Sequence, residues 1–128
     1  MMRCDKIIGG LMLPTCLFFA GAALAAGDAA AGKAIFGKTC QNCHSIDVGV
    51  NKVGPSLYGI IGRQAGVVQG FEYSDALKNS GKTWTVEELG LYLSNPRGSL
   101  HGVKMDFKGL TSESDRADVI AYLQSLQD

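Results

Sequence analysis

The sequence predicts a small all-α domain with long loops. Apolar residues recur at helical spacing in several stretches, and each of these stretches begins with a capping residue. No stretch alternates apolar and polar residues over a useful length, as a half-buried strand would. Loops this long are uncommon in a compact domain unless they wrap something. We therefore expect four to five helices folded around a bound group.

The first 26 residues predict a cleaved secretory signal peptide. Arg3 and Lys6 precede a long apolar run that ends in Ala23-Leu24-Ala25. Small residues in this spacing are typical of a signal cleavage site. Removal of residues 1–26 would leave a single domain, residues 27–128, in the periplasm.

Two other interpretations of this segment stay open. The apolar run from Ile7 to Ala25 is long enough to remain as a membrane anchor. Cys16 as a lipoprotein cysteine is disfavoured, because Leu13-Pro14-Thr15 before it lacks the usual small residues. We expect Cys4 and Cys16 to leave with the signal peptide.

The first helix of the domain is predicted to follow Asp28, a good N-cap, and to run over Ala29–Lys38. Gly32, Ile35 and Phe36 share one face of it. Glycine weakens a helix relative to alanine, so Gly32 indicates that another helix crosses closely there.

The middle of the chain is predicted to be mostly loop. Residues 45–53 form a loop, and Gly54-Pro55-Ser56-Leu57-Tyr58-Gly59 indicates a turn. A short helix is expected over Ser74–Ser80, ended by Gly81.

Two further helices carry N-terminal signatures. Thr85-Val86-Glu87-Glu88 matches a capping box and starts a helix that ends at Asn95-Pro96. A loop is expected over Arg97–Leu110. Ser112-Glu113-Ser114-Asp115 starts the final helix, which runs to about Ser125.

The loop after the first helix contains the strongest chemical motif, Cys40-Gln41-Asn42-Cys43-His44. This C-x-x-C-H pattern is typical of c-type haem attachment. Residues i and i+3 on one helical turn project to the same side, so both thiols can reach one haem edge. The histidine that follows can supply a neutral nitrogen ligand to the iron.

A redox dithiol or half of a zinc site are the alternatives to haem. Beyond His44 the chain offers only His101 and no further cysteine to complete a zinc site. A thioredoxin-like motif would follow a strand, and none is predicted.

Met105 is the candidate for the second axial ligand. It is the only methionine beyond the predicted signal peptide, and it lies in a loop. Thioether sulfur suits a low-spin iron and raises its potential. A lone methionine is more often core filler, but an otherwise unfilled sixth position favours the ligand.

The domain resembles class I cytochrome c of the mitochondrial-like kind also found in bacteria. The resemblance covers nearly all of residues 27–126 and implies one covalent haem c. It rests on the haem motif together with Gly27-Asp28, Gly32-Lys33, Ile35-Phe36, Gly54-Pro55, Leu57, Gly59, Gly62-Arg63, Gly70-Phe71, Tyr73-Ser74-Asp75-Ala76, Trp84, Tyr92-Leu93, Asn95-Pro96, Lys104-Met105, Phe107, Gly109 and Arg116–Leu123.

The resemblance implies roles for particular residues. Gly32 and Phe36 would pack against Val119 and Tyr122 where the terminal helices cross. The carbonyl of Pro55 would accept a hydrogen bond from the His44 ring. Three residues would contact a buried haem propionate: Tyr73 and Trp84 by hydrogen bonds, and Arg63 by its charge. Without the resemblance to the family, Trp84 would be interpreted as an ordinary core residue and Arg63 as a solvated loop charge.

The sequence departs from the family on the methionine side. Val103 and Leu77 stand where the family usually has threonine and asparagine, while Tyr92 is kept. We therefore expect a drier Met105 side, with the Tyr92 hydroxyl bonded mainly to the Met105 sulfur. His101 replaces the usual proline and is expected to be a solvated loop residue. A weaker hypothesis has His101 or Lys104 replacing Met105 at raised pH.

An iron with both axial positions filled exchanges single electrons and has no open site for substrate. The resemblance therefore implies a monomeric electron carrier rather than an enzyme, with a cytochrome bc1-type donor and an oxidase, reductase or photosynthetic reaction centre as acceptor. The alternatives are a haem peroxidase or gas sensor and a membrane-anchored or complex-bound electron-transfer subunit. The numbers of acidic and basic residues are equal, and the chain has no run of basic residues of the kind that binds nucleic acid.

The family typically surrounds its exposed haem edge with lysines. This chain offers few basic residues there and places Asp106 among them. We therefore predict association with redox partners that depends weakly on salt. The basic candidates are Lys38, Lys52, Arg97, Lys104 and Lys108.

Overall fold

The computed structural model describes residues 27–127 and folds them into five helices with no strand. The helices are α1 (Ala29–Thr39), α2 (Asp75–Lys78), α3 (Val86–Ser94), α4 (Pro96–Ser99) and α5 (Glu113–Ser125). This confirms the predicted fold class and number of helices. The predicted signal peptide, its possible retention as an anchor, Cys4 and Cys16 lie outside the described residues.

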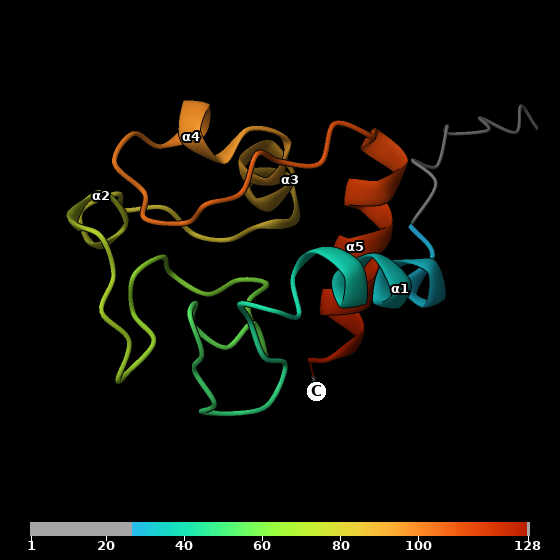
Figure 1. Cartoon of the computed structure of the whole chain (residues 1–128), viewed down its shortest axis with the longest axis horizontal. Helices are drawn as coiled ribbons and strands as arrows, with labels where there is room; N and C mark the ends of the chain where they lie inside the picture. Colours follow the sequence, from blue (N-terminus) through green and yellow to red (C-terminus); the bar gives the residue numbers. More distant parts are fainter. Residues whose placement is uncertain (1–26, 128) are drawn as a thin grey trace, which may run out of the picture.

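The first and last helices cross on one side of the molecule (Figure 1). Asp28 caps α1 through its carboxylate, which accepts from the backbone of Ala30 at 2.8 Å. The backbone N–H of Asp28 in turn donates to Asp118 Oδ1 on α5, at 2.7 Å. The rings of Phe36 and Tyr122 lie 5.6 Å apart between the helices. The predicted packing of α1 on the last helix is therefore confirmed.

Gly32 is buried where the two helices touch. A Cβ atom added there would lie 1.9 Å from the carbonyl oxygen of Asp118, well inside van der Waals contact. The obstacle is backbone, which cannot turn aside as a flexible side chain can. The close crossing expected from a glycine in the middle of a helix is thus observed.

We expect Gly32→Ala to destabilise the haem-loaded protein by about 1–3 kcal/mol, because α5 must move to make room. Thermal or denaturant unfolding measures the loss. Gly37→Ala on the same helix is the matched control, since its Cβ would meet only the Gln41 side chain, at 3.6 Å. That control should be neutral or more stable by about 0.5–1 kcal/mol, from helix propensity alone. Equal effects of the two substitutions would contradict the packing role.

Two local predictions need correction. The short helix expected over Ser74–Ser80 is limited to α2, with Ser74 as its N-cap. Part of the loop expected over Arg97–Leu110 is helical, because α4 forms directly after Asn95. Proline lacks the N–H that would continue α3, yet it fits the first turn of a new helix. The side chain of Asn95 caps that turn by accepting from Gly98 N at 3.0 Å.

The capping box predicted at the start of α3 is only half formed. Thr85 Oγ1 accepts from the backbone N–H of Glu88 at 3.0 Å, as expected. The Glu88 carboxylate does not return to the Thr85 backbone and instead binds the Lys82 ammonium. At the last helix, Ser112 caps α5 by accepting from Asp115 N at 3.2 Å, which confirms the predicted start.

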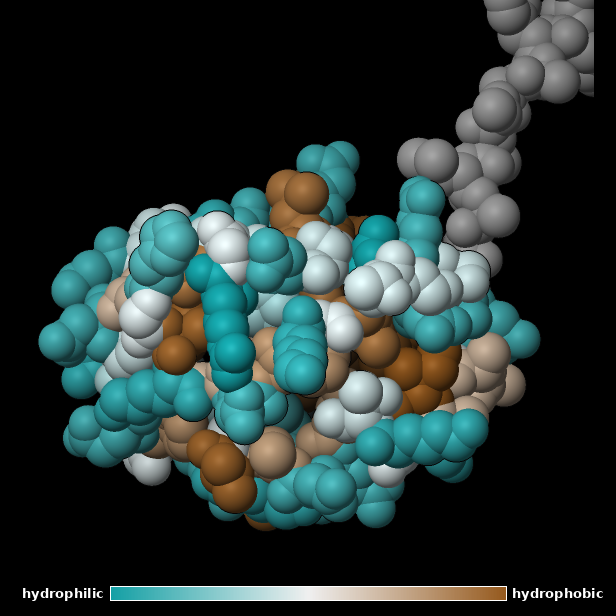
Figure 2. Space-filling view, turned by 45° about the horizontal axis from the view of Figure 1, so that its top comes forward, coloured by the Kyte–Doolittle hydropathy of each residue, from teal (hydrophilic) through white to brown (hydrophobic). Residues whose placement is uncertain are grey.

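The apolar core lies between α1, α3 and α5 and continues under the loops. Its buried members include Trp84, Leu89, Tyr92, Val119 and Leu123. Figure 2 shows a mostly hydrophilic face on which hydrophobic residues are visible through gaps between hydrophilic ones. No helix within residues 27–127 is both long and apolar enough to span a membrane.

Candidate functional site

A cavity of about 580 Å³ lies inside the helices and loops. This volume is typical of sites for small molecules and cofactors, which measure about 300–1,000 Å³. The structure brings every site residue predicted from the sequence to its wall. Those residues are Cys40, Cys43, His44, Pro55, Arg63, Tyr73, Trp84, Tyr92 and Met105.

The two thiols enter the cavity from the turn that ends α1. Cys40 is the C-cap of the helix, and its N–H donates to the Phe36 carbonyl at 2.9 Å. The backbone N–H groups of Cys43 and His44 both donate to the carbonyl of Cys40, at 3.1 and 2.9 Å. Burial, with the neighbouring Cys43 thiol, raises the pKa of Cys40 to about 11, whereas Cys43 is exposed. The turn thus presents two thiols and an imidazole together.

The ring of His44 is oriented by the segment 54–55. Its Nδ1 lies 2.8 Å from the carbonyl oxygen of Pro55. A carbonyl can only accept, so Nδ1 carries the proton and Nε2 is left with a free lone pair. Burial lowers the pKa of His44, which favours the neutral ring that can bind a metal.

Gly54 makes room for this ring. A Cβ atom at Gly54 would lie 2.2 Å from Cε1 of His44. The backbone N–H of Gly54 donates to the Cys43 carbonyl at 2.7 Å, so the segment is tied directly to the thiol motif. This role of Gly54 was not predicted from the sequence. The available signal in the sequence was the position of Gly54, directly before Pro55, whose carbonyl was expected to orient His44.

Arg63, Tyr73 and Trp84 line the cavity together. The Arg63 guanidinium donates to the carbonyl oxygens of Ser56 and Tyr58, at 3.0 and 3.1 Å. Burial lowers its pKa, but a guanidinium remains charged at neutral pH. Burial raises the pKa of Tyr73, so its hydroxyl keeps a proton to donate while it accepts from Val68 N at 3.2 Å. This wall can therefore receive a buried carboxylate.

Met105 reaches the cavity from the loop between α4 and α5. The loop is pinned to the end of α3, because Leu110 N donates to the carbonyl of Leu93 at 2.7 Å. Gly109 packs so closely that an added Cβ would lie 2.5 Å from the Ser94 carbonyl. Met105 itself is half-buried. The loop that carries it is therefore held in place at its C-terminal end.

Tyr92 is buried and lines the same cavity as Met105. Its ring lies 4.9 Å from that of Trp84. Burial raises the pKa of Tyr92, so its hydroxyl is protonated at neutral pH. Leu77 and Val103 pack against the core, which gives this region an apolar character. The hydrogen bond from Tyr92 to the Met105 sulfur stays a prediction. His101 is exposed, as expected for a solvated loop residue.

Phe71 also has a role that was not predicted from the sequence. This ring lines the cavity and meets Tyr73 edge-on, with centroids 4.9 Å apart. The alternation Phe71-Glu72-Tyr73 in an extended segment was the available signal, since residues i and i+2 share one face. The rings of Phe71 and Tyr73 together form an apolar part of the cavity wall.

The basic residues expected at the docking face are exposed, but one of them is neutralised. Arg97 forms an ion pair with Asp106, and these two side chains are 60% and 92% exposed. Lys52 donates to the carbonyl of Gln41 at 2.6 Å. Lys104 and Lys108 are exposed on the loop that carries Met105.

The residues present fit a c-type haem. Two thiols, a neutral imidazole with a free nitrogen and a thioether are the donor set of such a group, and all line one mostly apolar cavity. Residues 27–127 contain no cluster of three or more His, Cys, Asp or Glu side chains able to hold a metal ion. A zinc site at the C-x-x-C motif therefore has no further ligands in this part of the chain.

Comparison with known proteins gives one family. Residues 29–127 match the family model described as cytochrome c. Cytochrome c2 of Blastochloris viridis is 46% identical over 120 residues, which cover 93% of this chain and 91% of that protein. Cytochrome c of Euglena viridis is 45% identical over 102 residues, covering 80% of this chain and all of that protein.

A cytochrome c-type protein of Rhodobacter capsulatus, named cyt cy, is 53% identical over 100 residues. The match covers 78% of this chain but spans only half of that protein. Among solved structures, cytochrome cH from Methylobacterium extorquens aligns with a TM-score of 0.73 at 42% identity, covering 77% of this chain and 99% of that one.

Proposed function

The chain belongs to the cytochrome c family, and from that premise we propose which of its residues carry one-electron transfer. It holds a single covalently attached haem c and works as an electron carrier. Members of this family are carriers rather than enzymes in general. When bound, the haem iron supplies reversible exchange of one electron.

Cys40 and Cys43 would attach the haem covalently, and His44 and Met105 would bind its iron. The observation that carries this assignment is the meeting of all four side chains on one cavity, with His44 held by the Pro55 carbonyl so that Nε2 is available. Tyr73, Trp84 and Arg63 would bind a haem propionate, and Tyr92 would support Met105. The apolar walls exclude water, which limits the reorganisation that accompanies a change of charge.

An optical spectrum of the purified protein in both redox states tests this assignment. We expect a covalently held haem and the absorption band of methionine bound to ferric iron. The reduced protein should bind carbon monoxide slowly or not at all at neutral pH, because His44 and Met105 would both hold the iron. Rapid binding would favour the peroxidase or gas-sensor alternative, and a colourless protein would overturn the proposal.

Residues 1–26 are removed as a secretory signal, and the domain 27–128 works in the periplasm. The match to cytochrome c2 of Blastochloris viridis covers 93% of the chain, so it extends into this N-terminal segment. N-terminal sequencing or intact mass of the exported protein decides the matter. A mass that still includes Met1 to Ala25, found in the membrane fraction, would support an anchored or complex-bound subunit instead.

The partners are redox proteins, with a bc1-type donor and an oxidase, reductase or reaction centre as acceptor. They meet the protein at the face that carries Lys38, Lys52, Lys104 and Lys108. The ion pair of Arg97 with Asp106 removes one positive charge from this face. The positive electrostatic potential that remains on this face is modest, so it attracts an approaching acidic partner only weakly.

The electron-transfer rate with an anionic reagent such as ferricyanide is expected to fall only shallowly between low and moderate salt. Asp106→Asn frees the Arg97 charge and should steepen this dependence and raise the low-salt rate. Glu113→Gln makes the same charge change away from the cavity and is the matched control. Stopped-flow rates over a salt series measure all three proteins. A steep loss of rate in the unmodified protein would contradict the weak-field assignment.

A further inference from the structure

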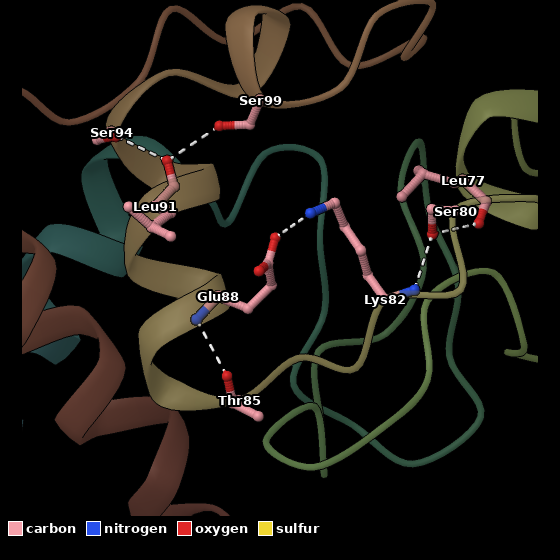
Figure 3. Close-up of polar contacts among 8 residues, drawn as sticks. All are labelled: Leu77, Ser80, Lys82, Thr85, Glu88, Leu91, Ser94 and Ser99. Atoms are coloured by element: carbon pink, nitrogen blue, oxygen red, sulfur yellow. Dashed lines mark hydrogen bonds and ion pairs between the residues drawn. The ribbon is translucent and has the colours of Figure 1, made fainter.

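A partly buried ion pair joins two segments that each bring residues to the cavity. The ammonium of Lys82 binds Oε1 of Glu88, and these side chains are only 28% and 26% exposed (Figure 3). The two other ion pairs found within residues 27–127 each include a carboxylate side chain that is 92% exposed. The Lys82–Glu88 pair is therefore the least screened by water of the three.

Lys82 stands at the end of a short backbone ladder. Ala65 N donates to the Lys82 carbonyl at 2.9 Å, and Gly62 N donates to the Trp84 carbonyl at 2.9 Å. Trp84 N donates back to the Arg63 carbonyl at 2.8 Å. This ladder fixes Trp84 and Arg63 beside each other on the cavity wall.

Glu88 stands in the first turn of α3. Its N–H is held by the Thr85 hydroxyl, while its carboxylate leaves the helix to reach Lys82 (Figure 3). The same helix carries Tyr92, whose ring packs against that of Trp84. Glu88 thus ties α3 to the ladder through its side chain, while its backbone N–H takes part in the cap of the helix.

We propose that Lys82 and Glu88 are positioning residues that hold the Trp84–Arg63 ladder against α3. Neither residue lines the cavity, so both act through the residues that do. Losing the pair would let the ladder separate from α3 and admit water beside Trp84. The environment of the bound haem would change, and with it the reduction potential. This inference rests on the proposed haem-binding function.

Glu88→Gln in the haem-loaded protein tests the proposal. We expect amide hydrogen exchange at Gly62, Ala65 and Trp84 to become about tenfold faster. Exchange at Val119, deep in α5, reports the loss of global stability and should accelerate by no more than the same factor. Trp84 is the only tryptophan of the chain, so its haem-quenched fluorescence should rise as the ladder loosens. The reduction potential should shift upward, because the Lys82 charge is left uncompensated.

Glu87→Gln is the matched control. This substitution removes the same negative charge one residue earlier, in the same turn of α3. The Glu87 side chain is exposed and belongs to none of the three ion pairs described above. The substitution should leave the three amides and the fluorescence unchanged and move the potential less. The reciprocal double variant Lys82→Glu, Glu88→Lys restores an opposite-charge pair and should return all readouts towards the original values.

The outcomes separate this proposal from the wider function. Equal behaviour of the Glu88→Gln and Glu87→Gln proteins, both carrying haem, overturns the positioning role alone. A failure of the reciprocal variant to rescue exchange does the same. If Glu88→Gln does not fold, Glu88→Asp with a shortened carboxylate replaces it, and the same amides are read. A protein without covalent haem would instead overturn the function proposed above.

Discussion

Replacing Cys40 and Cys43 together by alanine should unfold most of the domain. The cavity that their thiols enter is part of the core, because Trp84, Leu89 and Val119 border both. Each Å³ of dry void in a core costs about 24 cal/mol, and an ordinary domain has only about 5–15 kcal/mol of stability in total. A cavity of about 580 Å³ left without its apolar occupant is therefore a large burden on the fold. A chain that cannot retain its haem therefore has no folded state of comparable stability.

Circular dichroism and the absorbance of covalently retained haem measure this loss. Each single substitution should give an intermediate result, because one thioether bond can still form. The matched control is Gln41→Ala with Asn42→Ala, which alters the two exposed residues between the thiols and leaves the motif intact. We expect it to keep both haem and helix content. A colourless double-cysteine variant with full helical signal would refute the reasoning.

Met105→Ala should convert the carrier into a protein that binds external ligands. The loop that carries Met105 is anchored at Leu110 and packed at Gly109, so its path should survive the loss of one side chain. The methionine absorption band should vanish, and the reduced protein should bind carbon monoxide rapidly. The potential should fall, since axial ligands set haem potentials over a range of about 0.8 V.

Val103→Ala is the control for this substitution. It shortens a neighbouring side chain of the same loop that packs against the core and has no part in ligation. Its spectrum and its inertness to carbon monoxide should match those of the unmodified protein. An unchanged methionine band in Met105→Ala would transfer the ligand role to another residue.

Helix starts were the most predictable part of the fold. Asp28, Thr85 and Ser112 each cap the helix that their side chains indicated, because capping is a contact between near neighbours. Helix α4 was missed for a local reason too. Asn95-Pro96 ends α3 and also begins α4, because Asn95 serves as the C-cap of the first helix and the N-cap of the second.

Long-range contacts of single side chains could not be predicted in the same way. Glu88 has two partners available, the Thr85 backbone and the Lys82 ammonium, and only the folded path of the 79–84 segment decides between them. The fit of Gly54 against His44 likewise depends on a turn that brings residues ten apart into contact. The site residues themselves were predictable because their chemical types and spacing carry the signal.

The pairing of α1 with α5 also bears on the time course of folding. The first helix finds its partner only in the final helix, joined to it by contacts such as Asp28 with Asp118, ninety positions apart. Contacts between such distant segments slow folding, and synthesis delivers the N-terminal half first. The chain cannot complete its hydrophobic interior before its last helix is available to pack against the first. A nascent chain cut short ahead of Val119 should therefore stay open to proteases however much cofactor surrounds it.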